Sequence, residues 1–78
     1  MTNKEKLTNA FVETFGIEEN DCQGLQYQGI DQWDSVGHMS LIAAIEDSFG
    51  IEMDTDDIID LSSFEKAKEI VAKYGVEL

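Results

Sequence analysis

Asp34 and Ser35 are the residues whose types and position best suit chemistry in this chain. They directly precede an apolar-periodic stretch at residues 36–49, and an acid followed by a hydroxyl at the start of such a stretch is typical of a helix N-terminus. A side chain there lies beside free backbone N–H groups and the positive end of the helix dipole, which attract an anion such as phosphate. On this pattern alone two interpretations stay open: the pair caps a helix, or Ser35 marks a site for an anion.

Nucleophilic catalysis by Ser35 would require a general base and a group that orients it. His38 is the only histidine, and its spacing of three residues makes contact with Ser35 conceivable. However, His38 falls among apolar helix positions and no third group is recognisable, so a packed, hydrogen-bonded histidine is the better interpretation. We predict no catalytic residue and no enzyme activity of the chain itself.

The acids Asp54, Asp56, Asp60 and Glu65 have some of the spacing of a calcium-binding loop. The fifth and sixth positions of that loop, which need an oxygen ligand and a glycine, are instead occupied by two isoleucines. We therefore predict no metal site. Cys22 has acidic neighbours, which disfavour a reactive thiolate, and is predicted to be a small filler residue.

The composition restricts the kinds of partner. Five lysines against seventeen acids give a net charge of −12, which repels phosphate backbones and anionic surfaces, so nucleic acid is excluded as a partner. All five lysines lie near the two ends, and residues 7–65 contain no basic side chain. This acidic middle favours partners with a basic surface, although the acidity could also serve only to keep a small protein soluble.

Length and cysteine content indicate a single domain, residues 1–78, in a reducing compartment. One cysteine cannot form an internal disulfide, so we expect a cytoplasmic location. The longest uninterrupted apolar stretch, residues 41–45, is too short to span a bilayer. We expect a monomer that is not inserted in a membrane.

Apolar periodicity predicts an all-α fold, a four-helix bundle with a short third helix and a long ordered loop between helices one and two. The predicted helices are residues 3–15, 35–49, 54–61 and 64–74, and the loop is residues 17–33. Four loop residues are spaced as anchors on a helical core: Ile17, Leu25, Tyr27 and Ile30.

Three cap patterns mark predicted helix starts. Thr2 and Glu5 have the spacing of a capping box, and Ser62 and Glu65 repeat it before the fourth helix. Asp54 provides a good capping residue for the third helix.

The helix at residues 35–49 has two apolar faces. The face predicted to pack on the core consists of His38, Leu41, Ile42, Ile45 and Phe49. The opposite face has small apolar residues beside polar and acidic ones: Val36, Met39, Ala43, Ser40, Glu46 and Asp47. Exposed apolar groups rimmed by acids favour a docking surface; the alternative is that they are scattered surface apolar residues.

The chain resembles the acyl carrier protein family, the four-helix carriers of 4′-phosphopantetheine. The most specific part is Asp34-Ser35 followed by Val36, and then the helix that continues through residues 41–51. The resemblance covers nearly the whole chain and includes the length, the acidity, the long loop and the short third helix.

The resemblance implies that Ser35 is the attachment point of 4′-phosphopantetheine, transferred from coenzyme A by a separate phosphopantetheinyl transferase that recognises Asp34. The thiol of this arm would hold acyl or aminoacyl groups as thioesters and deliver them between enzymes of lipid, fatty acid or specialised metabolite biosynthesis. Five residues match family positions that dock basic enzyme surfaces: Val36, Met39, Ala43, Glu46 and Asp47. An acyl cleft between the second and third helices would be lined by Leu41, Ile45, Ile58 and Leu61.

Two departures from the family pattern, and one likeness to carriers of dedicated pathways at Trp33, suggest a free-standing carrier of a specialised pathway rather than of the bulk fatty acid cycle. Ser40 stands where an acid is usual, Gly37-His38 replaces a more polar pair, and Trp33 precedes Asp34. The implied partners are an acyl ligase, an acyltransferase or a synthase. The alternative function is an unmodified acidic helical module that only binds a partner.

Overall fold

The computed structural model describes all residues, 1–78, and is all-α, with four α-helices and no strands. The first helix, α1 (Asn3–Phe15), begins where the sequence predicts. Thr2 Oγ1 accepts from the Glu5 backbone N–H at 3.1 Å and the Glu5 carboxylate accepts from the Thr2 N–H at 3.1 Å, which completes a capping box. Gly16 ends the helix at φ +65°, a conformation that glycine adopts without strain.

The second helix, α2 (Ser35–Phe49), also has its predicted bounds. Asp34 is the N-cap, and its Oδ1 accepts from the Gly37 backbone N–H at 2.8 Å. The first turn of α2 is therefore fixed by a local hydrogen bond, and Ser35 is its first residue.

The third and fourth helices, α3 (Thr55–Asp60) and α4 (Phe64–Lys73), exist as predicted, but α3 is one residue shorter at each end and α4 ends one residue earlier. Asp54 is the N-cap residue of α3, as predicted. The side chain of Asp54 makes no capping hydrogen bond. Ser63, not Ser62, caps α4, because Ser63 Oγ accepts from the Lys66 N–H at 2.9 Å. The predicted capping box of Ser62 and Glu65 is therefore wrong: the cap lies one residue later, and the residue three positions after it is Lys66, whose side chain cannot accept the second hydrogen bond of a box.

The segment between α1 and α2 contains a short 3-10 helix, η1 (Glu19–Cys22), and then runs back to the α3–α4 connection. Gln26 pairs with Ser63 in an isolated antiparallel bridge, and Tyr27 N–H donates to the Ser62 carbonyl at 2.8 Å. These backbone hydrogen bonds explain why a long connection without regular structure holds a defined path.

The anchors of this segment differ in part from the predicted ones. Leu25 is buried, and Ile17 and Ile30 are partly buried against the core. Tyr27 is an exposed residue rather than a core anchor, whereas Trp33 and Cys22 are almost completely buried. The indole of Trp33 is the largest fully buried side chain.

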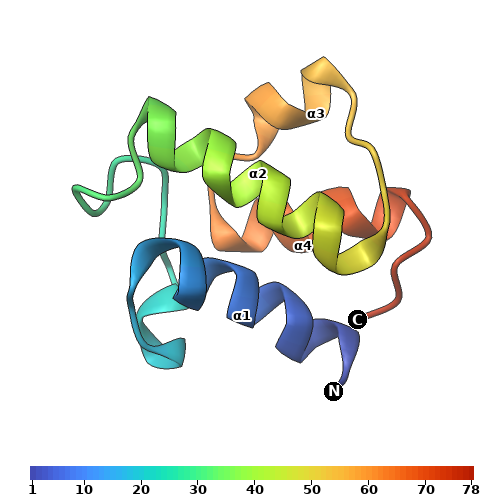
Figure 1. Ribbon diagram of the computed structural model, residues 1–78, viewed down its shortest axis with the longest axis horizontal. Coiled ribbons are helices and arrows are strands. Elements are labelled where there is room, and N and C mark those ends of the chain that lie inside the picture. Colours follow the sequence, from blue (N-terminus) through green and yellow to red (C-terminus); the bar gives the residue numbers. More distant parts are fainter.

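In Figure 1, α2 crosses the middle of the molecule with α1 on one side and α3 on the other, and the two termini lie close together. The core contains side chains from α1, α2, α4 and the long segment, and Ile58 of α3 is partly buried against it. Its largest members are Trp33, Phe11, Leu7, Leu41, Ile42 and Ile45. None of the helices combines the length and the apolar character that crossing a membrane requires.

Candidate functional site

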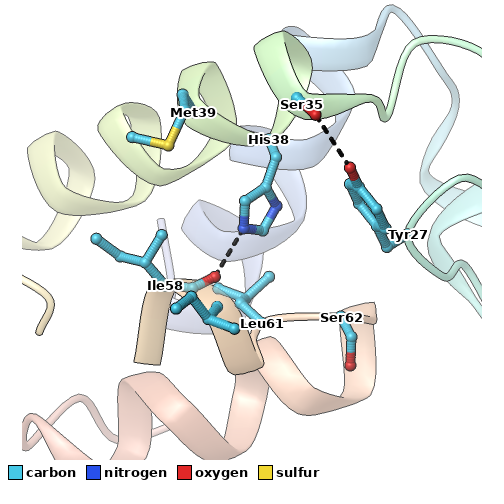
Figure 2. Close-up of a pocket in the computed structure, with 8 residues that line it drawn as sticks. Tyr27, Ser35, His38, Met39, Ile58, Leu61 and Ser62 are labelled. Carbon is cyan, nitrogen blue, oxygen red and sulfur yellow. Dashed lines mark hydrogen bonds between the residues drawn. The ribbon is translucent and has the colours of Figure 1, made fainter. Parts of the chain in front are cut away.

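A cavity of about 370 Å³ opens beside the start of α2, between α2 and α3 (Figure 2). Most of its lining is apolar, with a few polar groups at the rim. The lining residues are Tyr27, Ser35, His38, Met39, Ile58, Ile59, Leu61 and Ser62. A small apolar cavity with a few convergent polar groups is the usual form of a ligand site.

Ser35 is exposed and lies at the rim of this cavity. Its Oγ is 3.4 Å from the hydroxyl of Tyr27, the only side chain that it contacts by hydrogen bonding. The neighbouring Asp34 is already engaged as the cap of α2. The serine hydroxyl is therefore accessible, while the backbone that holds it is fixed.

His38 is held by hydrogen bonds at both ring nitrogens. Nδ1 accepts from the indole N–H of Trp33 at 3.0 Å, and Nε2 lies 2.7 Å from the carbonyl oxygen of Ile58. Because the indole can only donate and the carbonyl can only accept, the imidazole is neutral with its proton on Nε2. Neither nitrogen is free to act as a base toward Ser35.

His38 also connects two walls of the cavity. It belongs to α2, and its partner Ile58 belongs to α3 (Figure 2). The sequence places His38 on the core face, and the structure shows it half-buried, between the Trp33 indole and the cavity.

Gly37 allows the long segment to pass very close to the first turn of α2. A Cβ atom at this position would lie 1.9 Å from the backbone carbonyl oxygen of Gln32, a distance that real Cβ atoms do not reach. The glycine is therefore required for the close approach of the backbone at the first turn of α2, the turn that begins with Ser35. Sequence reasoning treats Gly37 only as a departure from a more polar pair and misses this role.

On the other side of α3, a buried acid joins this helix to α4. Asp57 is 6 % exposed, accepts from Lys73 Nζ at 2.6 Å, and accepts from the Tyr74 hydroxyl at 2.5 Å. The Tyr74 oxygen in turn accepts from the Asp54 backbone N–H at 2.9 Å. A buried carboxylate needs such partners, and here it has two.

These hydrogen bonds shift the pKa values of three side chains. The hydrogen bond from Lys73, and to a smaller extent the hydrogen bond from Tyr74, lowers the pKa of Asp57 below its usual range. The hydrogen bond to Asp57 raises the pKa of both Lys73 and Tyr74. Sequence reasoning missed Asp57, although it lies four residues from two apolar residues, Met53 and Leu61, that are both buried.

The predicted docking residues differ in exposure: four are exposed, and Glu46 is half-buried. Val36 and Met39 are 76 % and 55 % exposed, and Ala43 and Asp47 are exposed too. Glu46 is half-buried, and its carboxylate accepts from the Met53 backbone N–H at 2.8 Å. Glu46 thus fixes, through this hydrogen bond, the segment that connects α2 to α3.

The α3 helix adds a residue to this surface that sequence reasoning did not name. Ile59 is 72 % exposed and lies with Met39 at the cavity. Val36, Met39 and Ile59 are the most exposed large apolar side chains within the helices. Isolated exposed apolar residues are ordinary, but here two of them border one cavity.

The predicted acyl cleft is only partly where the cavity lies. Ile58 and Leu61 line it, whereas Leu41 and Ile45 are fully buried in the core and do not. Leu41 and Ile45 lie further along α2 than Ser35, His38 and Met39, the residues of this helix that line the cavity. The cavity lies nearer the N-terminal end of α2, where it reaches Ser35.

No group of three or more His, Cys, Asp or Glu side chains is arranged to hold a metal ion. Burial and then the charges of Asp21 and Glu19 raise the pKa of the Cys22 thiol, which is enclosed in the core. A thiol of this kind is poorly reactive.

The chain matches no protein-family model, and no curated protein matches it in sequence.

Proposed function

We propose that this chain is a carrier protein that bears 4′-phosphopantetheine on Ser35 and delivers acyl or aminoacyl groups between enzymes. One observation supports this most strongly: an exposed serine hydroxyl, fixed in the first turn of α2, opens onto an apolar cavity between α2 and α3. The four helices and the long connection are in keeping with a carrier-type four-helix bundle.

The residues around Ser35 fit a phosphate ester. The hydroxyl is exposed, no side chain covers it, and the nearest hydrogen-bonding group, Tyr27, is a neutral donor. As the first residue of α2, Ser35 also lies beside backbone N–H groups that favour a negative charge. All five lysines lie outside residues 7–65. No lysine close to Ser35 in the sequence therefore competes with these backbone N–H groups for the phosphate.

In the proposed modification, Ser35 Oγ forms a bond to the phosphorus of coenzyme A that carries the pantetheine. The bond from that phosphorus to the adenosine 3′,5′-bisphosphate leaving group breaks, and the hydroxyl proton passes to a base of the transferase. This base must come from the transferase, because both nitrogens of His38 are occupied. The attached arm supplies a terminal thiol for thioester chemistry.

The chain contributes position and recognition rather than catalysis. Asp34 fixes the first turn of α2 and stands beside Ser35 for recognition by the transferase. Val36, Met39 and Ile59 supply an apolar docking area next to Ser35, and Asp47 supplies an exposed negative charge on the same helix as Ser35. Partners with a basic surface around an apolar centre would fit: a transferase, an acyl ligase, an acyltransferase or a synthase.

The cavity suits the cargo of such a carrier. Ile58, Ile59, Leu61 and Met39 provide apolar contacts for an acyl chain, and Ser35 lies at the entrance. We propose a cytoplasmic, monomeric carrier that serves a specialised pathway.

An unmodified acidic interaction module is the competing proposal, since exposed apolar residues rimmed by acids would serve it as well. Incubation with coenzyme A, magnesium and a broad-specificity phosphopantetheinyl transferase separates the two. The carrier gains the mass of one phosphopantetheinyl group, and the module gains none.

A further inference from the structure

We propose that Tyr27 is a positioning residue for the group on Ser35: its hydroxyl donates a hydrogen bond to a phosphate oxygen once Ser35 is modified. This inference rests on the proposed function and concerns one side chain of the long segment. The starting observation is the 3.4 Å separation of the Tyr27 and Ser35 hydroxyl oxygens.

The Tyr27 hydroxyl has no stronger partner. Strong O–H···O hydrogen bonds are about 2.5–3.0 Å long, so the contact with Ser35 is a weak one. Ser35 Oγ is also the only hydrogen-bond partner of this phenol. A phosphate on Oγ brings additional acceptor oxygens to the same place, and hydrogen bonds to a charged acceptor are about twice as strong as neutral ones.

The backbone around Tyr27 is fixed independently of Ser35. Tyr27 N–H donates to the Ser62 carbonyl at 2.8 Å, Gln28 N–H donates to the Trp33 carbonyl at 3.1 Å, and Gly29 N–H closes a turn on Gln26 at 2.8 Å. The hydroxyl is therefore held in place before any group is attached. Such preorganisation reduces the entropy lost when the contact forms.

The phenol ring is fixed as well. It packs edge-on against the Trp33 indole with centroids 6.2 Å apart, and edge-on against the His38 imidazole at 5.6 Å. Tyr27 as a whole residue is 37 % exposed, so the hydroxyl can reach a group that extends into solvent. In Figure 2 the hydroxyl points directly at Ser35.

The other polar side chains at the cavity cannot replace it. His38 has both nitrogens engaged, and Ser62 lies across the cavity with its hydroxyl turned away from Ser35 (Figure 2). Tyr27 is thus the side-chain donor that a phosphate on Ser35 meets.

The test compares three chains loaded with phosphopantetheine: wild type, Tyr27→Phe and Tyr74→Phe. The second variant is a matched control, because it also removes one phenol hydroxyl, but on the far side of α3. Loading is first verified by intact mass. The phosphorus-31 resonance of the phosphodiester, the fluorescence of Trp33 and the urea midpoint are then measured.

We expect the phosphorus-31 resonance to shift in Tyr27→Phe and to coincide with wild type in Tyr74→Phe. The Trp33 emission and the urea midpoint of Tyr27→Phe should stay at their wild-type values, whereas the midpoint of Tyr74→Phe should fall. If all three loaded chains have the same phosphorus-31 resonance, the proposed Tyr27 contact is wrong, while the proposed function is unaffected. A shift in Tyr27→Phe accompanied by altered Trp33 emission would also overturn it, because a structural rearrangement would then explain the shift. No mass gain in the wild type would overturn the proposed function and this inference together.

Discussion

The indole N–H of Trp33 donates a 3.0 Å hydrogen bond to Nδ1 of His38, so a fully buried donor depends on a single acceptor from α2. Replacing His38 by Leu leaves this donor buried without a partner. A buried unsatisfied polar group costs about 1–3 kcal/mol, and we expect a loss of that order in the free energy of unfolding, measured by urea denaturation followed by circular dichroism.

A double-mutant cycle isolates this hydrogen bond from other effects of the substitution. In a Trp33→Phe background no indole donor is present, so His38→Leu should cost less than it does in the wild type. Equal costs in the two backgrounds would contradict the role assigned to the Trp33–His38 pair.

The link between α3 and α4 should weaken in acid. The folded-state pKa of Asp57 is lowered from an ordinary value of 3.8. The stability that this carboxylate contributes is therefore fully present above that value, and it is lost as the pH falls through the lower folded-state pKa. We expect wild type to be more stable than Asp57→Asn at neutral pH, and the difference to shrink below about pH 4.

Asp56→Asn is the control for this titration, because Asp56 is an exposed neighbour on α3 that makes no hydrogen bond through its side chain. It should match wild type at every pH. Urea midpoints between pH 2.5 and 7 provide the measurement. A difference between wild type and Asp57→Asn that is independent of pH would show that the charge of Asp57 contributes nothing.

Gly37→Ala should destabilise the start of α2. In an ordinary helix this change stabilises by about 1 kcal/mol, but here the new Cβ would lie 1.9 Å from the Gln32 carbonyl oxygen. Overpacking of this kind costs about 1–3 kcal/mol, so a net loss is expected. Thermal unfolding checks it, with Ser40→Ala, an exposed change on the same helix, as the control. A Gly37→Ala chain as stable as wild type would mean that the backbone of residue 32 has room to move.

Charge reversal at Asp47 should slow transfer to or from partner enzymes. Asp47 is exposed on α2 and makes no hydrogen bond through its side chain. It therefore tests electrostatic attraction of a basic partner more cleanly than Glu46, whose carboxylate accepts a hydrogen bond from the Met53 backbone N–H. We expect Asp47→Lys to lower the transferase rate about threefold to tenfold at low salt, and the effect to disappear as salt screens the charge.

Glu13→Lys makes the same change in net charge on the exposed side of α1 and should have a much smaller effect. Equal rates for Asp47→Lys and wild type at low salt would remove Asp47 from the docking surface.

The parts of the fold that could be predicted from sequence are those determined by local patterns. The capping box at Thr2, the cap at Asp34 and the stop at Gly16 each involve residues within a few positions of one another. Apolar periodicity then gave the bounds of α1 and α2 and the positions of Leu41 and Ile42 in the core.

What could not be predicted depends on residues far apart in the chain. Asp57 is an ordinary acid until α4 brings Lys73 and Tyr74 to it, 16 and 17 residues later. The predicted lining of an acyl cleft differs from the lining of the observed cavity for a similar reason. Leu41 and Ile45 lie on the helix face that meets the core, and only the packing of α3 and the long segment shows that the cavity opens at the Ser35 end of α2.

The central claim is that Ser35 is the attachment site, and the most direct measurement is the intact mass of the chain after incubation with coenzyme A, magnesium and a broad-specificity phosphopantetheinyl transferase. We expect wild type to gain one phosphopantetheinyl group. Ser40→Ala and Ser62→Ala, which remove exposed hydroxyls on α2 and at the cavity, should gain it too, and Ser35→Ala should gain none. No gain in wild type, or a gain that persists in Ser35→Ala, would contradict the account.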